Sequence, residues 1–178
     1  MTGTLPQNAK RNIILLVIVA SLGYFVDIYD LMIFSIVRVK SLHDIGIADA
    51  DIRSKGVYVI NMQVFGLMLG GILWGVLGDK LGRLKVLFGS ILVYSLANFA
   101  NGMVHDINSY AFVRFIAGIG LAGELGTGIT LVSETLSKEK RGYGTMIVTA
   151  IGVLGAVAAG IAGKYDWRMA YYIGGALG

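Results

Sequence analysis

The sequence contains no cysteine, a single proline and few charged residues, and each shortage narrows what the protein can be. Without cysteine the chain has no disulfides, thiolate metal sites or cysteine nucleophiles. Charged residues make up only 15% of the 178, against 56% apolar residues, which is far from the balance of a soluble domain. The net charge of +4 comes from lysines and arginines scattered between apolar runs, without a basic stripe. We therefore expect a protein embedded in a lipid bilayer, with no nucleic-acid partner.

Apolar runs of about 20 residues recur along the chain, and each is long enough to cross a bilayer as an α-helix. They predict an all-α, polytopic membrane helix bundle in one domain, residues 1–178. The expected spans are about 13–37, 56–78, 84–104, 110–132 and 142–163, followed by an incomplete run, 169–178. The first run is longer than the apolar core of a signal peptide, and the last is too short to span. We expect this chain to be part of a longer protein.

The charges in the breaks between spans bear on orientation. If the amino terminus is cytoplasmic, eight lysines and arginines lie inside and six outside. This small excess agrees with the positive-inside rule. We therefore expect an inner or plasma membrane protein with a cytoplasmic amino terminus.

One group of glycines has the letters of a nucleotide-binding loop. Gly118, Gly120 and Gly123 fit the pattern GxGxxG. A dinucleotide-binding fold needs a strand directly before this motif and an acidic residue after the next strand, whereas here the motif lies inside an apolar span. We interpret these glycines as a smooth helix face against a neighbouring helix or a substrate cavity, and we expect no cofactor.

Four ionisable residues interrupt the apolar spans: Asp27 and Asp30 in the first, Arg114 and Glu124 in the fourth. A charge at the bilayer centre costs at least about 2.5–3.5 kcal/mol, so such residues usually face a cavity or one another and mark a transport pathway. A helix rises about 1.5 Å per residue, and the two spans run in opposite directions. Asp30 and Arg114 are therefore expected within side-chain reach in depth. Glu124 is expected near the level of Asp27.

The two aspartates are three residues apart and share one helical face. Two carboxylates so close in a low dielectric do not both ionise cheaply, so one should hold a proton near physiological pH unless Arg114 neutralises the pair. The sequence thus predicts a proton-coupling site of Asp27, Asp30 and Arg114. Alternatively, one aspartate forms a static ion pair with Arg114, and the two readings are compatible. The expected substrate-binding residues are Tyr24, Gln63, Glu124 and Thr127.

A specific motif fills the break after the second span. Residues 75–85 read Gly-Val-Leu-Gly-Asp-Lys-Leu-Gly-Arg-Leu-Lys and closely resemble the loop signature of the major facilitator superfamily, Gly-x-Leu-x-Asp-Arg/Lys-x-Gly-Arg-Arg/Lys. The chain departs from it at Leu84, where the family usually has a base, and Lys85 follows one place later. Further segments similar to family motifs are Arg114-x-x-x-Gly118-x-Gly120, Ser133-Glu134, Lys140-Arg141-Gly142 and Asp166-Trp167-Arg168. The resemblance covers nearly the whole chain in the right order.

This resemblance implies the amino-terminal six-helix half of a major facilitator fold, with a carboxy-terminal six-helix half as partner in the same or a separate chain. Asp27-x-Tyr29-Asp30 resembles an element of proton symporters for organic acids and phosphate, with Ile28 in place of the usual glycine. The family implies a secondary active transporter that moves a small metabolite (an organic acid, phosphate or sugar) with a proton by alternating access. A proton-independent facilitator of the same fold and a non-transporting scaffold or receptor stay open as alternatives.

The motif residues at the span ends are expected to form a cytoplasmic gate: Gly75, Asp79, Gly82, Arg83, Glu134 and Arg141. Opposite charges on short loops would latch one conformation, whereas a plain solvated ion pair would contribute less than about 1 kcal/mol. We do not expect an enzyme or a metal site, because the buried acids have no Ser, His or Cys nucleophile beside them and no metal-ligand spacing occurs.

Overall fold

The computed structural model describes residues 7–125, 136 and 141–178, and among these all side chains except those of 7–13, 16, 83, 84 and 125. The described part of the chain is helical without strands, which confirms the predicted all-α bundle. Its elements are α1 (Gln7–Asp44), the short 3-10 helix η1 (Asp49–Asp51), α2 (Ile52–Leu81), α3 (Arg83–Asn101), α4 (Ile107–Leu125), α6 (Arg141–Ala162) and α7 (Trp167–Leu177). Among the described residues, three segments are long and apolar enough to cross a membrane: Val17–Asp44, Asp49–Leu81 and Arg141–Ala162.

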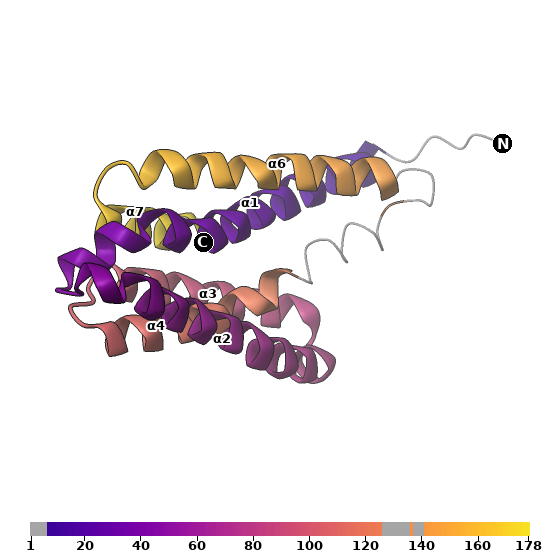
Figure 1. Cartoon of the computed structure of the whole chain (residues 1–178). Helices are drawn as coiled ribbons and strands as arrows, with labels where there is room; N and C mark the ends of the chain where they lie inside the picture. The colour runs from indigo at the N-terminus through magenta and orange to yellow at the C-terminus, as the bar shows by residue number, and fades with distance from the viewer. Residues whose placement is uncertain (1–6, 126–135, 137–140) are drawn as a thin grey trace.

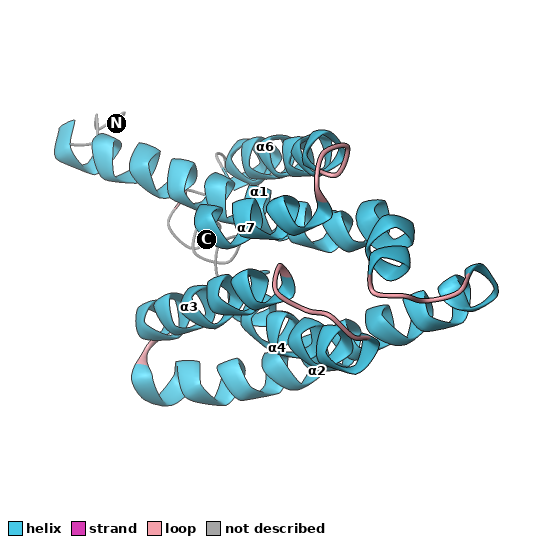
Figure 2. Ribbon diagram, turned by 90° about the vertical axis from the view of Figure 1, so that its left-hand side faces the viewer, coloured by secondary structure: helices cyan, strands magenta, loops and turns pink. Residues whose placement is uncertain are grey.

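The helices lie in two groups (Figure 1). One group holds α1, α6 and α7, and the other holds α2, α3 and α4, as the rotated view also shows (Figure 2). Within the groups α6 lies along α1, and both α2 and α3 lie along α4, while α7 contacts α3 across the boundary. Helices α1 and α4 also meet across this boundary, so their polar residues come together inside the bundle.

The contact between α2 and α4 depends on glycine. A Cβ atom on Gly66 would lie 2.1 Å from the carbonyl oxygen of Phe115, and one on Gly118 would lie 2.2 Å from the carbonyl oxygen of Gln63. Side chains do not approach backbone so closely, so only glycine lets these two helices touch at this distance. Close backbone contact supplies the van der Waals attraction that holds helices together in lipid.

The GxGxxG segment lies wholly within α4 and serves helix packing. Gly118 faces α2, while a Cβ on Gly120 would lie 2.5 Å from the backbone nitrogen of Tyr94 on α3. A Cβ on Gly123 would lie 2.4 Å from the Cβ of Ser90, also on α3. The pattern is therefore a face against two neighbouring helices, as the sequence indicates, and not a loop after a strand.

Single residues determine how α2 ends and how α7 begins. Gly82 separates α2 from α3 and has φ 90° and ψ 142°, a conformation that residues with a Cβ rarely adopt. Gly75 lies two turns earlier in α2 with no described atom within 4 Å of the position of a Cβ. At the other end of the bundle Asp166 caps α7, since its Oδ1 accepts a hydrogen bond of 2.7 Å from the backbone nitrogen of Arg168.

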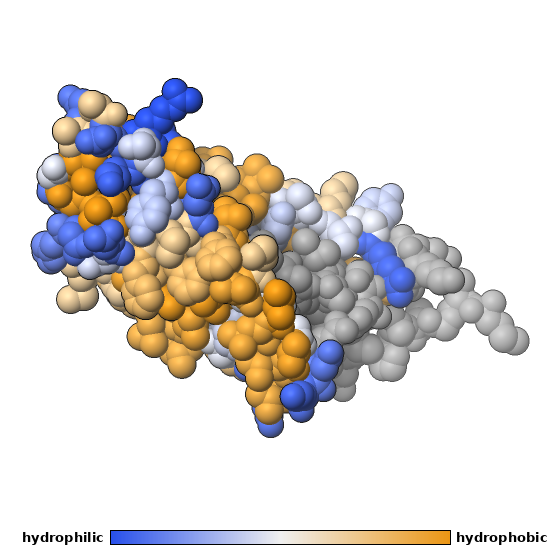
Figure 3. Space-filling model, turned by 60° about the horizontal axis from the view of Figure 1, so that its bottom comes forward, coloured by the Kyte–Doolittle hydropathy of each residue, from blue (hydrophilic) through white to orange (hydrophobic). Residues whose placement is uncertain are grey.

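The outward surface of the long helices is apolar. On α2 the exposed large side chains include Val64, Phe65, Met68, Ile72 and Val76. Figure 3 shows hydrophobic residues across the middle of the visible face, the largest group of hydrophilic residues at the upper left, and smaller hydrophilic groups at the lower edge and on the right. An apolar exterior on helices of spanning length suits a hydrocarbon solvent and would be costly in water.

Candidate functional site

The first feature of the site is a buried ion pair between α1 and α4. Arg114 donates from Nη1 to Asp30 Oδ1 at 3.0 Å, and from Nη2 to Oδ2 at 3.2 Å and to the Asp30 carbonyl at 3.3 Å. The two side chains are 0% and 1% exposed. Gln63 of α2 donates from Nε2 to Asp30 Oδ2 at 3.1 Å. Both carboxylate oxygens therefore have charged or amide donors, and one carboxylate joins three helices.

Aromatic rings surround the Arg114 guanidinium. Its Cζ lies 5.5 Å from the ring centroid of Tyr171 and 5.9 Å from that of Phe34, distances at which the ring faces attract a cation. The hydroxyl oxygens of Tyr110 and Tyr171 are 2.7 Å apart, and the Tyr110 hydroxyl donates to Ser41 Oγ at 3.2 Å. Sequence reasoning missed Tyr110 and Tyr171. The available signal was a phenol inside an apolar span, where its hydroxyl needs a partner.

The second feature is a pair of carboxyl groups on the same two helices. Asp27 is 2% exposed and Glu124 is 6% exposed. Their carboxyl groups lie close enough to form a hydrogen bond if one of the two carries a proton, because an ionised carboxylate only accepts. The remaining oxygens, Asp27 Oδ1 and Glu124 Oε1, have no hydrogen-bond partner among the described residues. The pair thus consists of two buried carboxyl groups close together, each with one oxygen that has no donor in the described part of the chain.

A cavity of about 150 Å³ opens beside Glu124. Its other lining residues are Val19, Leu22, Gly23, Val26, Ile91, Leu177 and Gly178. The walls are apolar, so Glu124 is the ionisable group that faces this space.

The predicted substrate-binding residues have different surroundings. Gln63 contacts Asp30, as given above. Tyr24 packs between α1 and α6, because a Cβ on Gly152 would lie 2.1 Å from its Cδ1 and it borders the buried cluster that holds Ala20 and Val148. Thr127 lies outside the described residues. Their contacts with a substrate stay predictions.

The predicted gate is described only in part. Glu134 and the side chain of Arg83 lie outside the described part of the chain. Asp79 is exposed. Arg141, also exposed, donates from Nε to the Leu136 carbonyl at 3.0 Å. The latch between these charges therefore stays a prediction.

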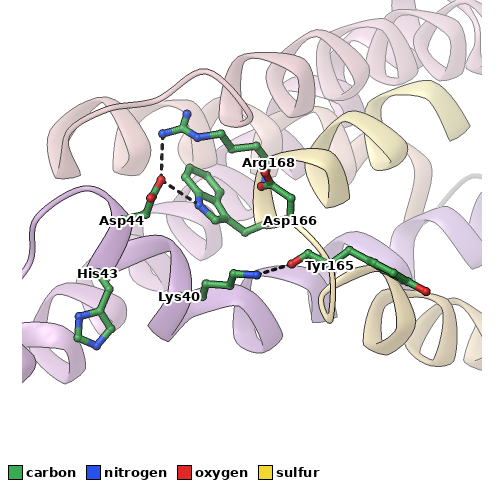
Figure 4. A pocket seen from close by; sticks show the side chains of 7 residues that line it. Lys40, His43, Asp44, Tyr165, Asp166 and Arg168 are labelled. Atoms are coloured by element: carbon green, nitrogen blue, oxygen red, sulfur yellow. Dashed lines mark hydrogen bonds and ion pairs between the residues drawn. The ribbon is translucent and has the colours of Figure 1, made fainter.

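A second polar cluster lies where α1 ends and α7 begins, at the end of the bundle opposite the α2–α3 turn (Figure 1), and Figure 4 shows its side chains. Asp44 Oδ2 accepts from Trp167 Nε1 at 3.2 Å and from Arg168 Nη2 at 3.3 Å. The Lys40 ammonium donates to the Tyr165 carbonyl. We name these five residues the Asp44 cluster. With His43 and Asp166 they line an open cavity of about 640 Å³, and they join the end of α1 to the start of α7.

Together the apolar exterior, the helices of spanning length and the buried ionic groups define an integral membrane helix bundle. The chain belongs to the Major Facilitator Superfamily, which it matches over residues 20–178. This confirms the resemblance seen in the motifs at residues 75–85 and around Arg114.

The chain is similar to transporters of several named compounds. A putative niacin/nicotinamide transporter, NiaP, of Bacillus subtilis (strain 168) is 31% identical over 144 residues, 80% of this chain and 35% of the relative. The 3-(3-hydroxy-phenyl)propionate transporter of Escherichia coli (strain K12) is 29% identical over 124 residues, 67% and 31%. Low affinity inorganic phosphate transporter 4 of Petunia hybrida is 30% identical over 158 residues, 82% and 30%. The chain thus spans about a third of the length of these curated relatives.

Proposed function

We propose that this chain is the amino-terminal half of a secondary active transporter that carries a small metabolite together with a proton by alternating access. The observation that carries the proposal is the close pair of the Asp27 and Glu124 carboxyl groups, buried between α1 and α4. Ionisable residues inside a membrane bundle mark ion and substrate pathways more often than they serve packing. The relatives named as transporters support the same activity.

The proposed proton site, Asp27 with Glu124, differs from the predicted site. The sequence predicts a proton-coupling site of Asp27, Asp30 and Arg114. Asp30 is fully engaged by Arg114 and Gln63, which stabilises its ionised form. The proton therefore binds at the Asp27–Glu124 pair, and the Asp30–Arg114 pair holds α1, α2 and α4 in register. Removing the shared proton leaves two adjacent carboxylates that repel each other. This repulsion acts between α1 and α4 and biases the equilibrium between two arrangements of the helices.

The substrate is proposed to be a small anion. Two of the three relatives described above are named for a propionate and for phosphate, both anions at neutral pH. Arg114 is already paired with Asp30, so the positive contact for such a substrate comes from elsewhere in the transporter. A carboxy-terminal six-helix half would supply the facing wall, because alternating access needs two halves around a central site. The charge distribution and the motif at residues 75–85 support a cytoplasmic amino terminus.

The test is uptake by the protein, as its gene encodes it, reconstituted into liposomes with an imposed inward proton gradient. Labelled niacin, phenylpropionate and phosphate serve as probes. We expect accumulation of at least one probe above its equilibrium level, and loss of that accumulation with a protonophore. Asp27→Asn and Glu124→Gln should each abolish it while leaving exchange of labelled for unlabelled substrate in place. Asp51→Asn, a matched change on an exposed residue, should behave as the unmodified protein.

Two results would contradict the proposal. Accumulation that persists in both Asp27→Asn and Glu124→Gln would remove the proton site. Uptake that equilibrates and ignores both the gradient and the protonophore would identify a facilitator of the same fold.

A further inference from the structure

The cavity beside Glu124 has one wall that comes from a single face of α1. Its residues are spaced by three, one and three positions, which places them on the same side of the helix: Val19, Leu22, Gly23 and Val26. Three further helices complete the lining, through Ile91 of α3, Glu124 of α4, and Leu177 and Gly178 at the end of α7. The end of α7 lies between α1 and α3 in both ribbon views (Figures 1 and 2). The cavity therefore lies where four helices meet.

The size and the walls of this cavity suit one apolar ring. Its volume is about 150 Å³, and the side chains around it are valine, leucine and isoleucine apart from Glu124. A protein cavity of about 150 Å³ with similar aliphatic and aromatic walls binds benzene. Leu22 and Leu177 are exposed on the surface of the described part of the chain, so a ligand can enter between α1 and α7.

Glu124 supplies a polar contact inside the apolar walls. Its side chain is buried, and its Oε1 has no hydrogen-bond partner among the described residues. Buried polar atoms normally have a partner, and a ligand is one source of it. A hydroxyl group on the edge of a ring would donate to this carboxyl, and a ring nitrogen would accept from it when the carboxyl carries a proton.

The same lining disfavours other classes of ligand. A phosphate or carboxylate group inside the cavity would lose its hydration to apolar side chains and lie next to another acid, which is costly. A sugar carries hydroxyls on every side, whereas Glu124 is the polar side chain among the lining residues that the structure describes. An acid that enters with its ring first keeps its own carboxylate at the mouth of the cavity, away from Glu124.

Gly23 leaves part of this volume open. No described atom lies within 4 Å of the position that a Cβ would take on Gly23. By contrast, a Cβ on Gly155 of α6 would lie 2.1 Å from the carbonyl oxygen of Phe25, on the same stretch of α1. Packing therefore requires glycine at position 155 and does not require it at position 23, where larger residues would favour the helix.

We propose that the cavity binds the ring of a small carboxylic acid with a single aromatic ring, whose edge contacts Glu124 and whose carboxylate lies at the mouth. This names the substrate class of the proposed transporter. Transport of the acid rests on the proposed function, whereas its binding in the cavity does not. The ring contacts the same carboxyl that the proposed function protonates, so substrate and proton meet at Glu124.

Binding is tested with the full gene product, purified in detergent, and labelled benzoate at equilibrium. We expect benzoate to bind at least about tenfold more tightly than acetate or phosphate, which have no ring. Naphthalene-2-carboxylate should also bind at least about tenfold more weakly than benzoate, because its second ring exceeds the cavity. Proton-driven accumulation of phosphate without binding of benzoate would overturn the ring site and leave the proposed function in place. Binding of benzoate without proton-driven accumulation would support the ring site and contradict the proposed function.

Two variants change the size of the cavity in opposite directions. Gly23→Val fills part of it and should weaken benzoate binding at least about tenfold, whereas Leu22→Ala enlarges it and should bring naphthalene-2-carboxylate to within about twofold of benzoate. The matched controls, Gly71→Val and Leu15→Ala, change residues outside the lining and should alter neither affinity. Thermal unfolding verifies that each variant is folded. Unchanged benzoate affinity in folded Gly23→Val, or an unchanged preference for one ring in folded Leu22→Ala, would overturn the proposal.

Discussion

The two acidic groups of α1 lie less than one helical turn apart, yet their surroundings differ completely. Asp30 faces a cation, and each of its oxygens accepts a hydrogen bond from Arg114 or Gln63. Asp27 faces a second acid, Glu124, and each of these two carboxyls has one oxygen without a partner in the part of the chain that the structure describes. The first pair is electrically balanced, and both oxygens of its carboxylate are hydrogen-bonded. Two ionised carboxylates as close as the second pair would repel each other, so the comparison separates a balanced ion pair from a pair of like groups.

Helices α1 and α4 carry both the Asp30–Arg114 pair and the Asp27–Glu124 pair, so the first pair constrains the position of the second. The Asp30–Arg114 pair fixes α1 against α4 and α2, so that the carboxyl pair remains within hydrogen-bonding distance. Under the proposed function, a change of protonation at Asp27 and Glu124 would act against a rigid neighbour, and the Asp30–Arg114 pair would convert this local change of charge into a bias on whole helices.

The largest loss of unfolding free energy should come from breaking the Asp30–Arg114 ion pair. Asp30→Leu leaves the Arg114 guanidinium buried without a counter-charge, which costs about 3–5 kcal/mol in unfolding free energy. Unfolding in detergent micelles measures this loss. Asp27→Asn, one turn away, should change the unfolding free energy by much less, because an amide can still hydrogen-bond Glu124.

A double variant is the control for this prediction. Asp30→Leu with Arg114→Met removes both charges, and we expect it to recover most of the stability lost in either single variant. A double variant as unstable as the sum of its singles would show that the two residues contribute independently and would contradict the ion-pair account.

A smaller loss of stability is expected from displacing the backbone next to the Asp30–Arg114 pair. Gly118→Ala places a Cβ 2.2 Å from the carbonyl oxygen of Gln63 and should cost about 1–3 kcal/mol by overpacking, while pushing Gln63 away from Asp30. Gly71→Ala, where no described atom lies within 4 Å of the Cβ, is the control and should not destabilise. Thermal unfolding compares the two. Equal midpoints would contradict the close approach of α2 and α4.

The smallest effect concerns a carboxylate outside the membrane, which serves as a reference for the two buried pairs. Asp106 precedes α4 and accepts bonds from the Ser109 hydroxyl at 2.6 Å and the Ser109 backbone nitrogen at 2.9 Å. The Ser109 hydroxyl bond is the main cause that holds the pKa of Asp106 below its usual value. Its stabilisation is therefore present at neutral pH and is lost as the pH falls through about 4 and below. Asp106→Ala should lower the thermal midpoint slightly at pH 7, by an amount that shrinks in acid. A pH-independent difference would contradict this assignment.

The sequence predicts the fold class and the pairing of depths well, for identifiable reasons. Apolar run length defines helices, and a constant rise per residue places Asp30 with Arg114 and Glu124 with Asp27. The rotation of each helix is not determined by depth, so the sequence does not show that Tyr24 packs against α6. Its contact with a substrate stays a prediction. Nor does depth reveal which donors reach a carboxylate. The separation of Asp27 from Asp30 depends on Gln63 and on the close approach of α2 to α4.

The aromatic surroundings of Arg114 and the buried amides of Asn98 and Asn101 on α3 were harder to foresee. Tyr171 reaches Arg114 from α7, 57 residues further along the chain, and no local pattern links the two positions. Asn98 and Asn101 look the same in sequence whether they bond a neighbouring helix or water. In the structure their amides are buried and have no hydrogen-bond partner among the residues described.

The most direct test of the central claim is infrared spectroscopy of the full protein in membranes at neutral pH, which detects the carbonyl stretch of a protonated carboxyl group. The account predicts such a band in the unmodified protein. It should be lost or shifted in Asp27→Asn and in Glu124→Gln, and should be unchanged in the surface control Asp51→Asn. A band that both site variants leave unchanged, or no protonated carboxyl at all, would contradict a shared proton between Asp27 and Glu124.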